Sequence, residues 1–94
     1  MRTAIIACAL ALLSGSAARA EEPELRPGPG RELVQANCAA CHTLAYIPMN
    51  SPFLTEAQWT AEVNKMVGTF HAPVAHEDIP AIIAYLTAQY GPLR

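Results

Sequence analysis

The sequence has little of three features that would each indicate a common class of protein. Basic side chains are few, because residues 21–94 hold four against eight acidic ones, a net charge of −4. Nucleic acid is therefore not an expected partner, since binding phosphates needs clustered positive charge. No segment alternates apolar and polar residues as a half-buried strand does, and no acid–base pair or nucleophile stands out. We expect an all-α fold and a chain that is not an enzyme by itself.

The chain also lacks an apolar run long enough to span a membrane, which takes roughly 20 residues. Its longest run, residues 4–13, follows Arg2 and precedes Ala18-Arg19-Ala20, where small residues occupy the two positions that a signal peptidase reads. This pattern predicts a secretory signal peptide over residues 1–20, cleaved after Ala20. The mature protein is then expected in the periplasm, with no membrane span.

Cysteine is scarce in this predicted mature chain, where only Cys38 and Cys41 remain. A domain of this size buries a modest fraction of its surface and usually needs disulfides, a metal or a cofactor as well. One bridge closing so short a loop would stabilise little. A larger group is therefore expected to complete the core.

Proline and glycine divide the mature chain into a lead-in and one domain. Residues 21–30 hold three prolines, two glycines and three glutamates, and predict an extended, exposed segment that lies outside the core. The folded domain is expected over residues 31–94. It begins with a short helix over residues 31–37, and residues 43–53, with two prolines, predict an irregular loop.

Two further helices are expected after this loop. Thr55 and Gln58 match the capping box that starts a helix, which should run from Glu56 to about Val67. The last helix should begin near His76, and Gly91-Pro92 should end it.

The segment Cys38-Ala39-Ala40-Cys41-His42 allows three kinds of site. A redox dithiol of the thioredoxin type needs a strand and a parallel sheet, which an all-α chain does not offer. A zinc site needs four ligands, and only His71 and His76 could complete it. In the third kind, two thiolates add to the vinyl groups of a haem and the next histidine binds the iron. The contiguous His42 favours this covalent haem c, with a structural disulfide as the alternative.

The rest of the predicted haem site is apolar, apart from a second iron ligand. Met49 and Met66 are the two methionines of the mature chain that could be the sixth ligand, and His71 and His76 are the other candidates. A methionine at helical spacing can equally be a core residue. Large side chains from the later segments should pack on the macrocycle: Trp59, Phe53, Leu54, Ile79, Ile82, Ile83 and Leu86.

In this order of segments the mature chain resembles the class I c-type cytochromes. The resemblance implies that Pro52, in the step Ser51-Pro52, accepts a hydrogen bond from His42. It also implies that Met66, 19 residues before Tyr85, binds the iron. In that family the ligand methionine usually lies in a loop, so the helix should end just before Met66.

Residues 46–54 and 59–66, with Ala72-Pro73-Val74, resemble more closely the small monohaem subunit of bacterial sulfite dehydrogenases. This resemblance implies single-electron transfer from a molybdenum-cofactor subunit that oxidises sulfite to sulfate, and onward to an electron-accepting cytochrome. A free cytochrome shuttle is the alternative. A haem enzyme or ligand sensor with an open sixth position is an alternative of another class.

Overall fold

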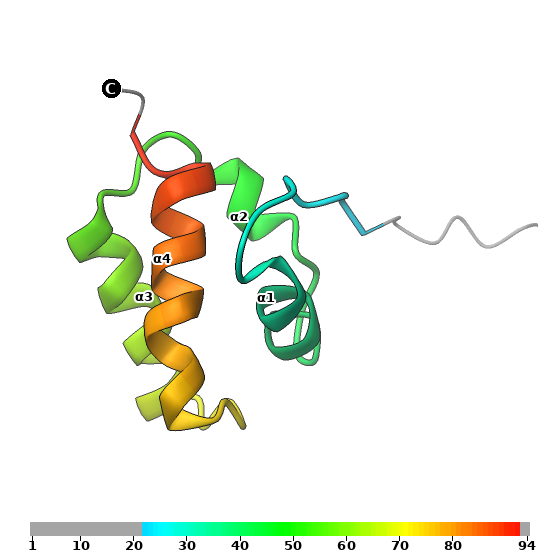
Figure 1. The fold of residues 1–94 in the computed structure, drawn as a ribbon. Helices are drawn as coiled ribbons and strands as arrows, with labels where there is room; N and C mark the ends of the chain where they lie inside the picture. The colour runs from blue at the N-terminus through cyan, green and yellow to red at the C-terminus, as the bar shows by residue number, and fades with distance from the viewer. Residues whose placement is uncertain (1–21, 93–94) are drawn as a thin grey trace, which may run out of the picture.

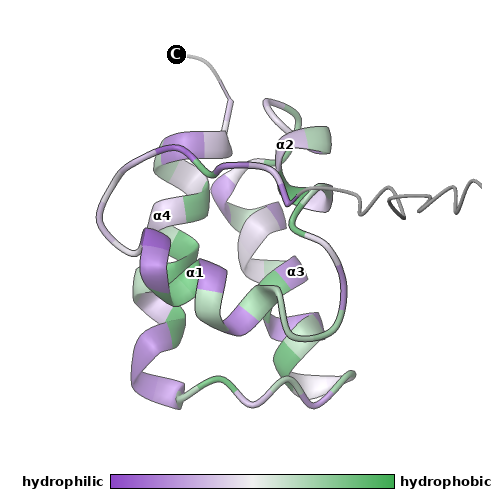
Figure 2. Cartoon of the chain, turned by 90° about the vertical axis from the view of Figure 1, so that its right-hand side faces the viewer, coloured by the Kyte–Doolittle hydropathy of each residue, from purple (hydrophilic) through white to green (hydrophobic). Residues whose placement is uncertain are grey.

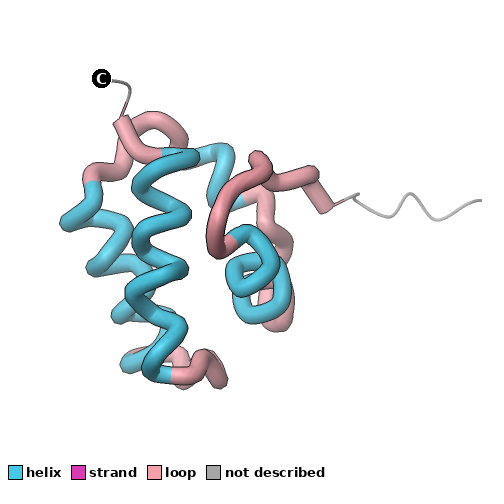
Figure 3. The backbone as a smooth tube through the Cα atoms, viewed as in Figure 1, coloured by secondary structure: helices cyan, strands magenta, loops and turns pink. Residues whose placement is uncertain are grey.

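Four α-helices and one short 3₁₀ helix make up the part of the chain that the structure describes, residues 22–92. They are α1 (Arg31–Cys38), α2 (Tyr46–Met49), α3 (Glu56–Gly68), the 3₁₀ helix η1 (His76–Asp78) and α4 (Ile79–Tyr90). No strand occurs over this range of the computed structural model (Figure 3), so the prediction of an all-α fold is confirmed. The predicted signal peptide lies outside the described residues. Within them, no helix combines the length and apolar character that a bilayer span requires.

The start of α3 follows the capping box that the sequence predicts. The Thr55 hydroxyl accepts a hydrogen bond from the Gln58 backbone N–H at 3.3 Å, and the Gln58 side chain accepts one from the Thr55 N–H at 2.9 Å. Two backbone donors that a helix start leaves unpaired are thereby satisfied. The helix runs to Gly68, one residue beyond the expected end.

The start of the last helix differs slightly from the expectation. The chain first forms the 3₁₀ turn η1, and α4 follows directly, with Pro80 in its first turn. A proline is tolerated there because the N–H groups of a first turn have no partner within the helix. The helix ends at Tyr90, before Gly91-Pro92, as predicted.

The irregular loop expected over residues 43–53 contains a helix, so that expectation is wrong. The helix α2 is a single turn, and Pro48 is its third residue. At that position the missing N–H is one that the helix would not have used. The two prolines therefore limit the length of the helix without preventing it.

Helix α4 lies at the centre of the fold and packs against each of the other helical segments (Figure 1). Helix α3 lies on one side of α4 and α1 on the other. The chain between α3 and α4 crosses one end of the molecule, and each helix carries both hydrophobic and hydrophilic residues (Figure 2). The side chains of Ile82, Tyr85, Leu86 and Tyr90 are all buried in the core.

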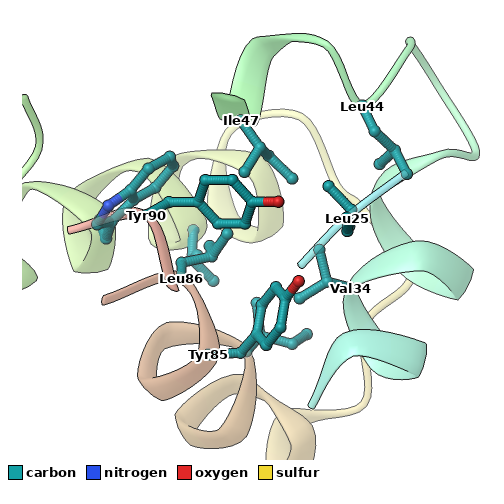
Figure 4. Packing of buried hydrophobic residues seen from close by; sticks show 10 residues of the cluster. Leu25, Val34, Leu44, Ile47, Tyr85, Leu86 and Tyr90 are labelled. Atoms are coloured by element: carbon teal, nitrogen blue, oxygen red, sulfur yellow. The ribbon is translucent and has the colours of Figure 1, made fainter. Parts of the chain in front are cut away.

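One residue of the lead-in segment, Leu25, is part of the core, against the expectation that the whole segment lies outside, while most of the other described residues of the segment are exposed, as expected. We call residues 22–27 the strap: its backbone forms no regular structure, but Leu25 is only 1% exposed. Figure 4 shows Leu25 between Leu44 and Val34, on the side to which the hydroxyls of Tyr85 and Tyr90 point. A single leucine among prolines and charged residues carries no periodic signal, so the composition of this segment did not predict that Leu25 would be buried.

Candidate haem site

A cavity of about 440 Å³ lies between the Cys38–His42 segment, α2, α3 and α4. Its volume falls in the range of roughly 300 to 1,000 Å³ that is typical of ligand pockets. Its walls are almost entirely apolar: Leu44 and Ile47 come from the segment at α2, Trp59, Val63 and Met66 from α3, and Ile82 and Leu86 from α4. The cavity therefore suits a large hydrophobic group.

All three reactive side chains of the CAACH segment line this cavity. Cys38 is the last residue of α1, and Cys41 and His42 lie in the turn that follows. Cys38 is partly buried, and burial raises the pKa of its thiol, whereas Cys41 is exposed. Both cysteines are free. The helix end thus delivers two thiols and one imidazole to a single opening.

The imidazole of His42 has two neighbours on its own side of the cavity. Its Nδ1 lies 2.9 Å from the carbonyl oxygen of Thr43. The ring of Tyr46 stands edge-on to it, with the two centroids 6.4 Å apart. Because Nδ1 faces a backbone carbonyl, Nε2 is the nitrogen left to bind a metal.

Pro52, the predicted hydrogen-bond partner of His42, is exposed and does not line the cavity. The structure places the Thr43 carbonyl at Nδ1 instead. The pairing of Pro52 with His42 therefore stays a prediction from the resemblance.

Of the four candidate sixth ligands, only Met66 lines the cavity. Met49 is 72% exposed, and His71 and His76 are exposed, all outside the cavity. Met66 shares one face of α3 with Trp59 and Val63, at helical spacing. The helix does not end before Met66, as a loop ligand would require, but continues to Gly68.

The predicted apolar wall is partly in place. Trp59, Ile82 and Leu86 line the cavity, while Leu54, Ile79 and Ile83 pack against the core elsewhere. Phe53 is 73% exposed and lies outside the cavity. A phenylalanine in a turn between helices has no periodicity to show which way it faces.

Other residues that line the cavity were not predicted from the sequence. Phe70, Ala72 and Val74 come from the segment between α3 and α4, and Leu44 and Ile47 from the region expected to be an irregular loop. Val67, which follows Met66 on α3, lines the cavity as well. The loop residues face the cavity because of the path of the chain, which helical spacing does not report.

One carboxylate lies at the edge of the otherwise apolar lining. Glu62 of α3 accepts a hydrogen bond from the Tyr46 hydroxyl at 3.1 Å and pairs with Lys65 at 3.1 Å. Burial and this bond to Glu62 raise the pKa of the Tyr46 phenol. The Tyr46 contact joins the His42 side of the cavity to α3.

The indole of Trp59 supplies a test of what the cavity could hold. Trp59 is 2% exposed, and its Nε1–H is buried without a hydrogen-bond partner in the described residues. A buried donor without an acceptor costs about 1 to 3 kcal/mol, so such a group points to an acceptor supplied from elsewhere. Haem carries two carboxylates besides its apolar ring. Two free thiols, one imidazole, apolar walls and this donor therefore fit a covalently bound haem.

The alternative zinc site finds no support in the side-chain arrangement. Over residues 22–92, no three His, Cys, Asp or Glu side chains gather as metal ligands would. A zinc ion in a structural site takes four such ligands.

Comparison with known proteins gives no further indication, since neither a family model nor a curated protein matches the sequence.

Proposed function

We propose that this chain is a monohaem c-type cytochrome with the class I fold, which carries single electrons in the periplasm. The observation that supports this most is that Cys38, Cys41 and His42 all open onto one apolar cavity. A CxxCH segment on an exposed surface would have no such support. A haem bound in this cavity would also add the buried surface that so small a domain needs to complete its core.

If the cavity holds haem, the main residues that line it have the following roles. Cys38 and Cys41 hold the haem by thioether bonds, and His42 binds the iron. The haem supplies reversible one-electron chemistry at a potential that its ligands and surroundings set. The apolar side chains exclude water, and the Trp59 N–H offers a hydrogen bond to a haem carboxylate.

The direct test is the mass of the mature chain after export in a host that attaches haem. We expect the mass of residues 21–94 plus one haem, retained under denaturing conditions because the bonds are covalent. A chain without haem, while a known c-type cytochrome in the same cells is loaded, would refute the proposal.

Met66 is the proposed sixth ligand, because among the candidates it alone reaches the cavity. Met66→Ala should change the visible spectrum and lower the reduction potential, since a thioether ligand raises it. Met49→Ala is the matched control, because Met49 is exposed and outside the cavity. Equal spectra for wild type and Met66→Ala would show that Met66 is not a ligand.

The helical setting of Met66 favours a second candidate, a haem enzyme or ligand sensor with an open sixth position. Helix α3 continues past Met66, so its backbone is held by the helix rather than by a ligand loop. Carbon monoxide binding to the reduced wild type separates the two. Binding as fast as at an open haem supports the open position, and slow or absent binding supports Met66 as ligand.

For the partner, we propose the molybdenum-cofactor subunit of a sulfite dehydrogenase, with a further cytochrome as electron acceptor. The resemblance of residues 46–54 and 59–66 to the haem subunit of such enzymes supports this choice. A permanent subunit should co-purify with a molybdenum protein that oxidises sulfite. A free electron shuttle, the alternative, should elute alone.

A further inference from the structure

We propose that the strap, residues 22–27, positions the iron-binding histidine, with Glu22 as the positioning residue. The inference rests on the proposed function, since it assigns His42 to the haem iron. It adds a role for a segment that precedes the CAACH motif and contributes nothing to the cavity wall.

One end of the strap is fastened to α4. The Arg26 backbone N–H donates to the Tyr90 hydroxyl at 2.8 Å, and the Tyr85 hydroxyl donates to the Arg26 carbonyl at 2.5 Å. The Arg26 guanidinium lies over the Tyr90 ring, 4.9 Å from its centroid, and donates to the Gln89 carbonyl. Leu25 beside it is buried in the core. This end therefore has a fixed position on the central helix.

The other end of the strap holds the chain just after His42. The Glu22 carboxylate accepts a hydrogen bond from the Leu44 backbone N–H at 2.7 Å, across 22 residues of sequence. Leu44 is 4% exposed, and it lines the cavity. Its own carbonyl accepts the Ile47 N–H at 3.0 Å, a bond of the turn that leads into α2. Glu22 thus fixes the residue at which the chain passes from His42 into α2.

The segment that carries His42 has few other hydrogen bonds, although the side chain of Leu44 packs in the core. Over the described residues, the other hydrogen bonds of residues 42–45 are local: His42 to Thr43, Ala45 to Thr43, and Leu44 and Ala45 as acceptors from Ile47 and Met49. His42 itself is exposed. A ligand on a short irregular segment keeps its orientation only if its supports are fixed. Within residues 22–92, the Glu22 bond is the long-range hydrogen bond of this segment.

The experiment compares three variants of the haem-loaded mature protein. Glu22→Ala removes the acceptor, and Glu22→Gln keeps an oxygen that can accept the Leu44 N–H without the charge. Glu24→Ala is the matched control, because it removes the same charge two residues away, where the side chain is 88% exposed and only a 3.9 Å pair with Arg31 is lost. Two readouts are taken: amide hydrogen exchange at Leu44, and the NMR signals of the His42 ring that the oxidised iron shifts.

In Glu22→Ala we expect exchange at Leu44 to accelerate about tenfold, as for loss of one hydrogen bond to a charged group, and the His42 signals to move. In Glu22→Gln, the exchange rate at Leu44 and the His42 signals should both stay close to their wild-type values. Glu24→Ala should change neither the exchange rate nor the signals. Equal changes in Glu22→Ala and Glu24→Ala would overturn the inference, since they would report charge alone. Unchanged His42 signals in Glu22→Ala would overturn it as well. Wild-type protein without haem would instead overturn the proposed function, and this inference with it.

Discussion

Two pairs of buried side chains on helix α4 differ in what completes their surroundings. Tyr85 and Tyr90 pack with Leu25 and Val34, and hydrogen bonds to the strap satisfy their hydroxyls. Ile82 and Leu86 face the cavity, and Trp59, which also lines it, has a buried N–H without a partner in the described residues. One half of the core is closed by the polypeptide alone. The other half has the shape and chemistry of a site that a bound group completes.

The largest expected effect comes from removing the two anchors of that group. Cys38→Ala with Cys41→Ala should abolish covalent haem attachment and leave the cavity unfilled. The apolar walls of the 440 Å³ cavity would then face water instead of the haem, and a domain this small has little stability to lose. Mass spectrometry and circular dichroism should show a chain that is haem-free and unfolded. A cooperative unfolding transition in this variant would show that the packing of α4 against the strap is enough to keep the domain folded without haem.

Trp59→Phe tests the cavity side more finely, because it keeps an aromatic ring and removes only the N–H. If that donor meets a carboxylate of the bound haem, the loaded variant should lose about 1.5 to 3 kcal/mol of unfolding free energy. Denaturant unfolding of the haem-loaded protein measures this. No loss of stability, or a gain, would mean that the N–H remains without an acceptor when haem is present.

Tyr85 tests the closed side through its response to alkali. Burial, and after it the neighbouring Tyr90, raises the pKa of Tyr85 from 10 to about 12. The folded state thus disfavours the ionised phenol, and the associated stability is complete below pH 10 and lost as the pH rises to about 12. The gap between these two pKa values corresponds to about 2 to 3 kcal/mol. Unfolding free energies measured from pH 9 to 12 should show this loss. In Tyr85→Phe, the unfolding free energy should fall less steeply over this pH range, because the variant has no phenol to ionise at this position.

The smallest expected effect comes from Gly30, which precedes α1 with a φ of 94°. A Cβ there would lie 3.0 Å from the Ala81 carbonyl oxygen and 3.1 Å from the Tyr85 Cβ. Gly30→Ala should therefore destabilise by about 1 to 2 kcal/mol, through the left-handed backbone and the tight contact with α4. Gly68→Ala is the control, because, apart from its chain neighbours and the backbone of its own helix, no described atom lies within 4 Å of its added Cβ, and it should be neutral or slightly stabilising. Equal thermal midpoints for the two variants would contradict this account.

The sequence predicted best where a local rule decides the outcome. The capping box of Thr55 and Gln58 placed the start of α3, and Trp59 and Met66, both expected at the site, line the cavity. It failed where tertiary packing decides. Leu25 is a lone leucine in a polar segment, and Phe53 a lone phenylalanine in a turn, yet the first is buried and the second exposed. Neither outcome has a periodic signal.

The same distinction holds within the candidate site. The CAACH motif identified Cys38, Cys41 and His42, which line one cavity, because the haem attachment that we propose would fix residue type and spacing at once. Phe70, Ala72 and Val74 were missed, since they come from a segment without helical periodicity. Glu22 was missed for another reason. Its contact with Leu44 depends on the path of the strap through the fold. Two residues that lie 22 positions apart in the sequence give no sign that they will meet.

The central place of α4 has a consequence for the order in which the described segments can fold. This helix follows every other helical segment of the described chain in sequence, and each of them packs against it. The strap, which precedes them all, also bonds to Tyr85 and Tyr90. The earlier segments therefore lack their main packing surface until α4 is present, so we expect them to stay open until the chain up to residue 90 is available to fold.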